Sequence, residues 1–394
     1  MLEVGFWLSI ALLIYVYAGF ALLVVIVGAI LDRRVRKQPI TPPVSLLIAA
    51  YNEEESIAQR LDNVLELDYP ANSIEIIVAS DGSDDRTEAV VASYARHGVR
   101  LISLPRGGKI HALNAAAAQA SGDILVFSDA NSMYERQALL ELVSNFADPE
   151  VGGVGGNTVY TEQIDSDSIS TGENLYWNYD KWLKEMESRT GSIVSAHGAI
   201  YAIRRELYKP LNDAAVTDDF AISTMVIEQG YRLVFEKNAR AYEVAIPATE
   251  REFGRKVRMM TRGLRGVLLR KKLLNPFRHK FYSVVLFTHK LLRRLVSLAL
   301  LALLVCSIML ISSGIFFLTF AVGQIVFYLL AGLGYVLRRY PIGRWRLLYI
   351  PFFYCLANTA AIIALINIVR GRQISRWQPH RHSPPSTAVE KMNA

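Results

Sequence analysis

The sequence offers little material for covalent or metal cross-links. Its 394 residues include only two cysteines, Cys306 and Cys355, which lie far apart within apolar runs. This spacing matches neither a disulfide framework nor a zinc site. We therefore expect the polar part of the chain to work in a reducing compartment, where structural disulfides are rare.

Charge is absent from two long stretches. Residues 6–31 carry none, and they exceed the roughly 20 residues that cross a bilayer as a helix. Only Glu3 is charged before this run, which is also longer than the apolar part of a signal peptide, so we expect a retained membrane span. Residues 295–337 are uncharged over 43 positions, too many for one span, and predict two spans joined at a Ser-Ser-Gly turn, 312–314.

The charges that flank these runs indicate orientation. Residues 32–37 are mostly basic and place the following polar domain on the cytoplasmic side. A last apolar run, near 347–369, predicts a fourth span, which would put the C-terminus outside. Four arginines between 370 and 381 favour the inside instead. One segment is therefore a candidate for a re-entrant or interfacial position.

Acidic residues are nearly absent from residues 251–294, where 14 lysines and arginines accompany Glu252. Apolar residues such as Val257, Leu264 and Leu268 recur there at three- and four-residue spacings, the pattern of an amphipathic helix. A basic helix can bind nucleic acid or an anionic membrane. Because membrane spans adjoin this one, we expect helices lying on the bilayer surface and no nucleic-acid partner.

The polar middle of the chain alternates apolar runs with helical stretches. Runs at 44–50, 74–79 and 124–128 predict strands buried on both faces, separated by helices. This alternation predicts an α/β domain with a mostly parallel sheet. Acidic and amide residues follow these strands, at the edge where open sheets bind ligands. We expect five parts: the first span with its basic flank (1–37), the cytoplasmic domain (44–250), interfacial helices (251–294), C-terminal spans (295–369) and a polar tail (370–394).

Two further segments of the polar domain are ambiguous. The glycine-rich run 151–156 fits neither known phosphate-loop spacing, so we expect a strand or turn that passes close to the site. Asp85 and Glu88 are spaced as a helix cap and its partner, which predicts a structural role for Asp85.

Seven motifs together resemble the membrane-integrated family-2 glycosyltransferases, the group that includes cellulose, hyaluronan, chitin and poly-N-acetylglucosamine synthases. The resemblance covers about residues 44–262. It implies a GT-A fold, a nucleotide-diphosphate sugar donor, Mg²⁺ or Mn²⁺, inversion at the anomeric carbon and a multi-pass position in a bacterial inner membrane. The matching residues are Tyr51-Asn52-Glu53, Asp81-Gly82-Ser83, Gly108-Lys109, Asp129-Ala130-Asn131, His197-Gly198-Ala199, Thr217-Asp218-Asp219 and Arg258.

The resemblance assigns catalysis to three residues. Asp219 takes the position of the base that accepts the proton of the acceptor hydroxyl, work that a carboxylate within hydrogen-bond reach can do. Asp218 stands where the family usually has Glu. These residues also precede an apolar run, so one of them could simply cap a helix. Arg258 would hold the leaving diphosphate, a role suited to a planar guanidinium.

The donor site follows from the same resemblance. Asp129 would bind the metal, whereas Asn131, at the family's second Asp, offers only a neutral oxygen. Asp81 could accept a hydrogen bond from the uracil imide, which favours a UDP-sugar. The other candidates for donor contacts are Tyr51, Asn52, Glu53, Lys109, Arg255 and Arg262.

The acceptor site is less well marked. His197 and Gly198 lie in the region that touches the acceptor sugar in the family. Trp177 and Trp182, in the helical stretch 172–189, could line a sugar site or serve only as packing anchors. Met259 stands where polymer-making relatives have Trp, and it lacks the flat face that stacks on a sugar ring. This departure puts long-chain polymerisation in doubt.

The leading interpretation is an inverting transferase that extends a polysaccharide at the membrane. Transfer to a lipid-linked acceptor remains open. A third hypothesis is a transporter or receptor that binds a nucleotide sugar without catalysis, although the apolar runs lack the charged residues of a transport path. Expected partners are the UDP-sugar, a glycan or lipid-linked glycan and the bilayer, with a second copy or an accessory export protein as candidates for a secretion path.

Overall fold

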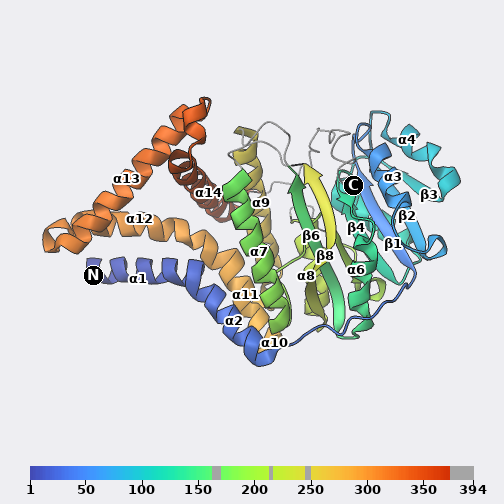
Figure 1. Cartoon of the computed structure of the whole chain (residues 1–394), viewed down its shortest axis with the longest axis horizontal. Helices are drawn as coiled ribbons and strands as arrows, with labels where there is room; N and C mark the ends of the chain where they lie inside the picture. Colours follow the sequence, from blue (N-terminus) through green and yellow to red (C-terminus); the bar gives the residue numbers. More distant parts are fainter. Residues whose placement is uncertain (162–169, 213–215, 245–249, 373–394) are drawn as a thin grey trace.

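The computed structural model describes residues 1–161, 170–212, 216–244 and 250–372. An α/β domain lies beside a group of long apolar helices (Figure 1). The strands are β1 (Val44–Ala50), β2 (Ile74–Asp81), β3 (Val99–Leu104), β4 (Ile124–Asp129), β5 (Met133–Tyr134), β6 (Val151–Thr161), β7 (Tyr201–Arg204) and β8 (Arg232–Val244).

The helices fall into two groups, those of the α/β domain and those of the apolar part. The domain contains α3 (Ile57–Leu65), α4 (Thr87–Ser93), α5 (Lys109–Gln119), α6 (Ala138–Ser144), α7 (Ser170–Thr190), α8 (Asp218–Glu228) and α9 (Glu250–Leu269). The apolar part and its connection contain α1 (Leu2–Ile14), α2 (Phe20–Leu31), α10 (Pro276–His279), α11 (Phe281–Leu286), α12 (Arg293–Met309), α13 (Ile315–Leu337) and α14 (Arg346–Val369).

The described strands form one sheet in the order β3-β2-β1-β4-β7-β6-β8-β5. The first four are parallel, as the buried apolar runs predicted. The direction changes at β7, which is antiparallel to both β4 and β6. This mixed arrangement confirms the predicted α/β GT-A-type domain with a largely parallel sheet.

The glycine-rich run lies inside β6, so the strand interpretation is confirmed. A Cβ atom on Gly156 would meet the Ile200 side chain at 2.7 Å and the Ala239 carbonyl oxygen at 2.8 Å. Only glycine therefore fits where β6 passes between its neighbours. The register of β6 against β8 also shifts on both sides of this run, which bends the pair.

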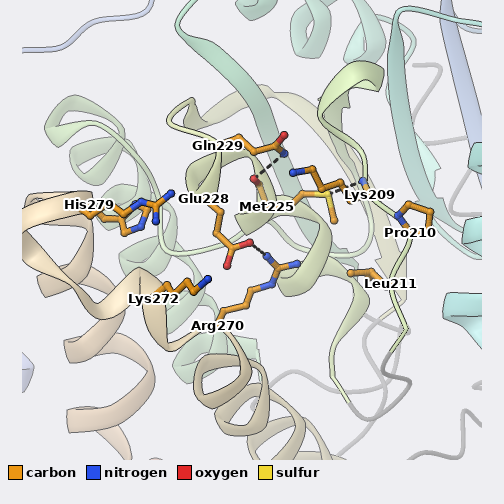
Figure 2. Close-up of a pocket in the computed structure, with 10 residues that line it drawn as sticks. Lys209, Pro210, Leu211, Met225, Glu228, Gln229, Arg270, Lys272 and His279 are labelled. Carbon is orange, nitrogen blue, oxygen red and sulfur yellow. Dashed lines mark hydrogen bonds and ion pairs between the residues drawn. The ribbon is translucent and has the colours of Figure 1, made fainter.

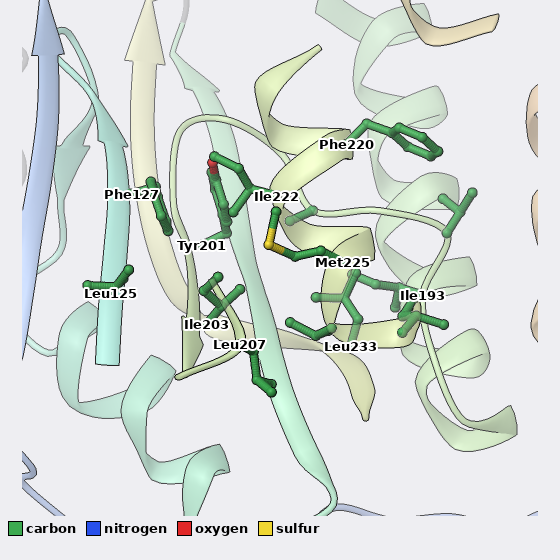
Figure 3. Close-up of a cluster of buried hydrophobic side chains, with 14 of the residues drawn as sticks. Leu125, Phe127, Ile193, Tyr201, Ile203, Leu207, Phe220, Ile222, Met225 and Leu233 are labelled. Atoms are coloured by element: carbon green, nitrogen blue, oxygen red, sulfur yellow. The ribbon is translucent and has the colours of Figure 1, made fainter. Parts of the chain in front are cut away.

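Hydrophobic cores cover both faces of the sheet, as a largely parallel sheet requires. On one face, Phe127 and Tyr201 stack with ring centroids 4.8 Å apart, and Met225 of α8 packs on this layer (Figure 3). On the other, Ile57 of α3 and Leu142 of α6 are fully buried. These two layers fix the strand ends that carry the predicted site.

Among the described residues, four helices are long and apolar enough to cross a membrane: Leu2–Leu31, Phe281–Met309, Ile315–Leu337 and Arg346–Val369. They account for the four predicted runs. The second helix begins at Phe281 rather than near Leu295, so residues 281–294 continue into it instead of forming a separate interfacial helix. Two polar side chains of this segment turn toward the domain: His289 Nε2 lies 2.7 Å from a carboxylate oxygen of buried Glu187, and Lys290 lies over the Phe220 ring.

The first long helix joins the two parts of the molecule. Phe20 and Val24 of α2 are buried in the same core as α8. Gly28 lies so close to α7 that a Cβ atom would stand 3.3 Å from the Met186 carbonyl oxygen. The inner half of this helix therefore packs as part of the α/β domain, while α1 packs on α12.

The last apolar helix lies against the domain-side helix α9. Asn367, near its end, is 3.4 Å from the Thr261 hydroxyl, and Phe353, in its first half, lies under the Lys256 ammonium at 4.5 Å. Figure 1 shows α14 between α13 and α9. Both halves of α14 thus contact the same domain helix.

Candidate active site

The ends of two parallel strands bring the predicted carboxylates to one edge of the sheet. Asp81 ends β2 and Asp129 ends β4, on either side of β1. Register aligns Ala49 of β1 with Asp129, and the loop after β1 carries Tyr51, Asn52 and Glu53. The strand-end argument from the sequence therefore places these residues together.

Lys109 links the two ends of the site. Its ammonium lies 2.5 Å from Asp129 Oδ1 and 2.8 Å from Asp218 Oδ2. Burial would lower the pKa of Lys109, but the two carboxylates raise it above its ordinary value. Burial likewise opposes ionisation of Asp218, yet Lys109 and Arg262 bring the pKa of that carboxyl below its usual range. The first residue of α5 is thus a fixed cation between two anions.

Asp218 and Asp219 form the first turn of α8, where the helix dipole favours carboxylates. Thr217 occupies the cap position but makes no side-chain capping bond. Asp219 accepts the Phe220 backbone N–H at 2.7 Å through one oxygen. Asp219 therefore takes part in the helix start, as the alternative from the sequence suggested, while Asp218 is engaged by Lys109.

Asp81 is fully buried and holds the loop before α5. It accepts backbone N–H groups from Gly107 at 2.7 Å and Gly108 at 2.8 Å, and pairs with the Arg106 guanidinium. Arg106 also stacks on Tyr51, 3.3 Å from the ring centroid. Arg106 was missed in the sequence because it lies in no recognised motif. Arg106 therefore connects Asp81 and Tyr51 on one side of the site.

The loop after β1 is tied to the loop after β2. Asn52 adopts a positive φ of 54° and its amide donates to Asp84 at 2.5 Å. Asp85 accepts the Thr87 backbone N–H at 2.9 Å, which supports its predicted capping role, although Glu88 accepts from Ser103 instead of completing a capping box. These bonds position Glu53 beside the carboxylates.

Two glutamates near Asp129 have unusual acidity. Burial raises the pKa of Glu53 to about 7, with the charge of Asp129 adding to the effect. Burial and Asp129 also raise the pKa of Glu243, at the end of β8, to about 7, although it accepts a 2.6 Å hydrogen bond from Ser132. Glu243 was not predicted, since it lies in an alternating strand without a motif. Carboxyl groups held close together resist simultaneous ionisation.

The predicted arginines lie along one side of α9, at spacings of three and four residues that share a helix face. Arg262 donates to the Val216 carbonyl oxygen just before α8. Burial and the neighbours Arg262 and Arg255 lower the pKa of Arg258. Arg255 acts on Glu243 and Arg262 on Asp218, so this face of α9 brings positive charge to the acidic edge of the sheet.

His197 and Gly198 pack beside Asp129. A Cβ atom on Gly198 would stand 3.2 Å from an Asp129 carboxylate oxygen. His197 contacts the Thr158 and Tyr160 hydroxyls at 3.2 and 3.3 Å, and burial and Lys184 lower its pKa. The imidazole is therefore neutral at the centre of the site.

The two tryptophans are placed differently. Trp182 on α7 is 41% exposed, with its ring centroid 6.0 Å from that of Tyr179. The Trp177 side chain lies outside the described residues. Trp182 thus fits the packing interpretation at least as well as a sugar contact, and its acceptor role stays a prediction.

The residues present can hold a divalent cation only together with a ligand. In the described part of the chain, no three His, Cys, Asp or Glu residues are grouped as a metal site. Asp129 and Glu243 offer hard oxygens, and Asn131 follows Asp129 by two residues. Mg²⁺ and similar ions accept one or two carboxylates when phosphates complete their coordination. The donor set fits a cation that arrives with a diphosphate.

Comparison with known proteins shows what the domain resembles. Residues 45–211 match the family model described as Glycosyl transferase family 2. The chain is 28% identical over 274 residues to "Probable glycosyltransferase YdaM" of Bacillus subtilis, covering 62% of this chain and 63% of that one. It is 28% identical over 213 residues to "Poly-beta-1,6-N-acetyl-D-glucosamine synthase" of Staphylococcus epidermidis, covering 52% and 50%. The chain thus spans less than two thirds of the length of these relatives.

A solved structure shares the fold over nearly the whole chain. It is "Mannosyltransferase PcManGT from Pyrobaculum calidifontis in complex with GDP-Man and Mn2+", with a TM-score of 0.69 and 22% identity. The match covers 95% of this chain and 100% of that one. At this identity, the likeness establishes the fold alone.

Proposed function

We propose that the protein is an inverting transferase that moves a sugar from a UDP-sugar to a growing polysaccharide at a bacterial inner membrane. The match of residues 45–211 to the Glycosyl transferase family 2 model supports this proposal. The domain faces the cytoplasm in this proposal, where the donor is available. The similarity to a poly-N-acetylglucosamine synthase supports a polymer as acceptor.

One observation carries the proposal: Lys109 joins Asp129, on the donor side, to Asp218, the neighbour of Asp219. The carboxylate of Asp219 therefore lies next to the Lys109 ion pairs. We expect the donor phosphates to bind at these ion pairs. Asp219 receives the proton of the acceptor hydroxyl as the oxygen attacks the anomeric carbon, and the bond to the nucleoside diphosphate breaks. The configuration at the anomeric carbon is thereby inverted. Positioned acids and bases of this kind contribute roughly 10²- to 10⁴-fold to rate.

The leaving diphosphate requires positive charge. Arg255, Arg258 and Arg262 approach it from α9, and Lys109 stands on the opposite side. Asp129, with Glu243 or Asn131, would hold Mg²⁺ or Mn²⁺, which supplies further stabilisation of the departing oxygen when bound. Tyr51, Asn52 and Glu53 form the wall proposed for the uridine, and buried Asp81 supports this wall through Arg106, which stacks on Tyr51.

Transfer to a lipid-linked acceptor is the second candidate. Met259 is 52% exposed and offers no aromatic platform for a sugar chain. Lys290 belongs to a helix that is suited to span the membrane, and its ammonium lies over the ring of Phe220 in α8. It therefore adds a cation close to the end of α8 that carries Asp219. Such a cation would suit a phosphate-linked acceptor rising from the bilayer.

Turnover of a panel of UDP- and GDP-sugars by the purified full chain tests the proposal. With Mg²⁺ or Mn²⁺ present, we expect UDP release from one donor and a ladder of polymeric products. A single lipid-extractable product would favour the lipid-linked acceptor. Release of GDP instead of UDP would overturn the donor assignment, and donor binding without release in the presence of both acceptor types would favour the non-catalytic hypothesis.

A further inference from the structure

A cavity of about 270 Å³ lies at the end of α8 opposite Asp218 and Asp219 (Figure 2). The loop after β7 forms one wall, and the segment between α9 and α11 forms another. An 11-residue helix separates the cavity from the catalytic carboxylates by about 15 Å. The cavity is therefore distinct from the sugar-transfer site.

The lining of this cavity is strongly basic. Arg270 pairs with Glu228, which is the one acidic residue among those lining the cavity. Lys209, Lys272 and Arg278 also line it, and each is exposed. The cavity thus presents three cations beyond the neutralised pair. Such an excess favours an anion.

His279 adds a directional group. His279 lines the cavity, and its buried Nε2 atom has no hydrogen-bond partner among the described residues. Burial and the neighbouring Arg278 lower the pKa of His279, so the ring is neutral without a ligand. Buried polar atoms almost always have a partner in folded proteins. A bound oxygen anion would provide one.

The position of the cavity favours the bilayer surface. Arg278 and His279 come just before Phe281, where a helix suited to span the membrane begins. Phe277, beside them, is 97% exposed, and Leu269 at the end of α9 is 55% exposed. Exposed apolar side chains beside basic ones are typical of segments that enter the headgroup layer.

We propose that this cavity binds a phosphate group, presented by the headgroup of an anionic phospholipid. The phosphate oxygens accept hydrogen bonds from Lys272, Arg278 and the His279 ring, while Phe277 lies against the acyl chains. Charge-assisted bonds to phosphate are among the stronger hydrogen bonds in proteins. The site would secure the junction of α9 and α11 to the membrane, and it does not depend on the identity of the sugar donor.

Native mass spectrometry of the full chain in detergent tests the site, using phosphatidylglycerol and phosphatidylcholine as probes. We expect preferential retention of phosphatidylglycerol, weakened about 30-fold in the double variant Lys272→Gln/Arg278→Gln, since each cation in contact with the phosphate contributes roughly fivefold. The control Lys271→Gln/Lys280→Gln removes the same charge from the same segment outside the cavity and should bind as the wild type does. Equal retention by all three proteins would overturn the proposal.

A second measurement identifies the source of the phosphate. Thermal unfolding is followed with phosphatidylglycerol or with millimolar inorganic phosphate. Stabilisation by the lipid alone supports a headgroup site, and equal stabilisation by phosphate overturns the lipid assignment in favour of a soluble anion. Should the double variant lose its monodisperse elution profile, the single exposed substitution Lys272→Gln replaces it, with about a fivefold loss expected.

Discussion

At the scale of single residues, Lys109 decides the charge balance of the site. Its ammonium is the shared partner of Asp129 and Asp218, and its side chain is only 16% exposed. Lys109→Gln leaves two partly buried carboxylates without this cation. We expect a loss of about 2–3 kcal/mol in unfolding free energy, at or below the lower end for broken buried pairs because Asp129 is partly exposed.

Denaturant unfolding of Lys109→Gln in detergent measures this loss. The substitution Lys237→Gln on the surface serves as control. An unfolding free energy equal to that of the wild type would contradict the central role of the Lys109 ion pairs.

Asp219→Asn tests the proposed base. The amide keeps the size of the side chain but accepts a proton poorly, so we expect UDP release to fall by about 10²- to 10⁴-fold. Donor affinity, measured by calorimetry, should change little because the proton moves only during transfer. The control is Asp68→Asn, on the far surface pairing with Arg136. Unchanged turnover in Asp219→Asn would remove Asp219 as the base.

The raised pKa values of Glu53 and Glu243 predict a pH dependence of stability. Both pKa values are near 7 in the folded protein, against 4.5 for a free glutamate side chain, so the folded state binds more protons between these values. Stability should therefore fall as pH rises from about 4.5 to 7 and then level off. Glu53→Gln should flatten this decline in thermal unfolding between pH 5 and 8. A slope as steep as in the wild type would contradict the assignment, and Glu66→Gln is the surface control.

Which of these residues could be predicted depends on where their signals lie. Asp81 and Asp129 could be found because buried apolar runs mark the strands they end. Arg106 and Glu243 could not, since their importance comes from contacts between segments far apart in the chain. Arg106 meets Tyr51 across two loops, and Glu243 reaches Asp129 only after β8 folds beside the opposite half of the sheet.

At the scale of elements, α9 presents its arginines to the site as one face. Arg258 is proposed to hold the diphosphate through a planar fork that lysine cannot reproduce. Arg258→Lys should therefore lower kcat/KM by about 10- to 100-fold, in line with the loss of a part of one charged donor. Steady-state kinetics measures this effect, with Lys256→Arg as the matched exchange on the same helix. Equal kinetics for Arg258→Lys and the wild type would place Arg258 outside the clamp.

The elements themselves were predictable to different degrees. Strands β1, β2 and β4 followed from continuous apolar runs. The pairing of β6 with β8 could not be predicted, because glycines and polar residues hide the strand period and the partners are some 80 positions apart. The early start of the second long helix was missed because the basic residues of segment 281–294 suggested an interfacial helix. In the structure, His289 faces Glu187 and Lys290 faces Phe220.

At the scale of the whole molecule, the packing of α14 addresses the conflict in orientation. Phe353 and Asn367 lie about 21 Å apart along α14, yet both contact α9. Because α14 packs against α9 and we expect α9 to lie on the bilayer surface, we expect α14 to run along the bilayer rather than across it. We therefore predict three crossings, with the C-terminus on the same side as the catalytic domain, where the terminal arginines favour it.

A cysteine placed at Ala394 in a Cys306→Ser/Cys355→Ser background tests this prediction. An impermeant thiol reagent should label it only from the side of the catalytic domain, and a cysteine at Leu2 should react only from the opposite side. Labelling of both from one side would contradict three crossings.

The inner half of the first long helix has a mechanical consequence. Since Phe20 and Val24 belong to the core of the catalytic domain, the inner half of this helix links the lipid directly to the enzyme. A thinner bilayer that tilts its outer half would pull on α7, which packs against α2. The length of the lipid tails should therefore affect the rate of sugar transfer. A fragment that begins after residue 37 would lose its membrane anchor and also part of the core of the catalytic domain.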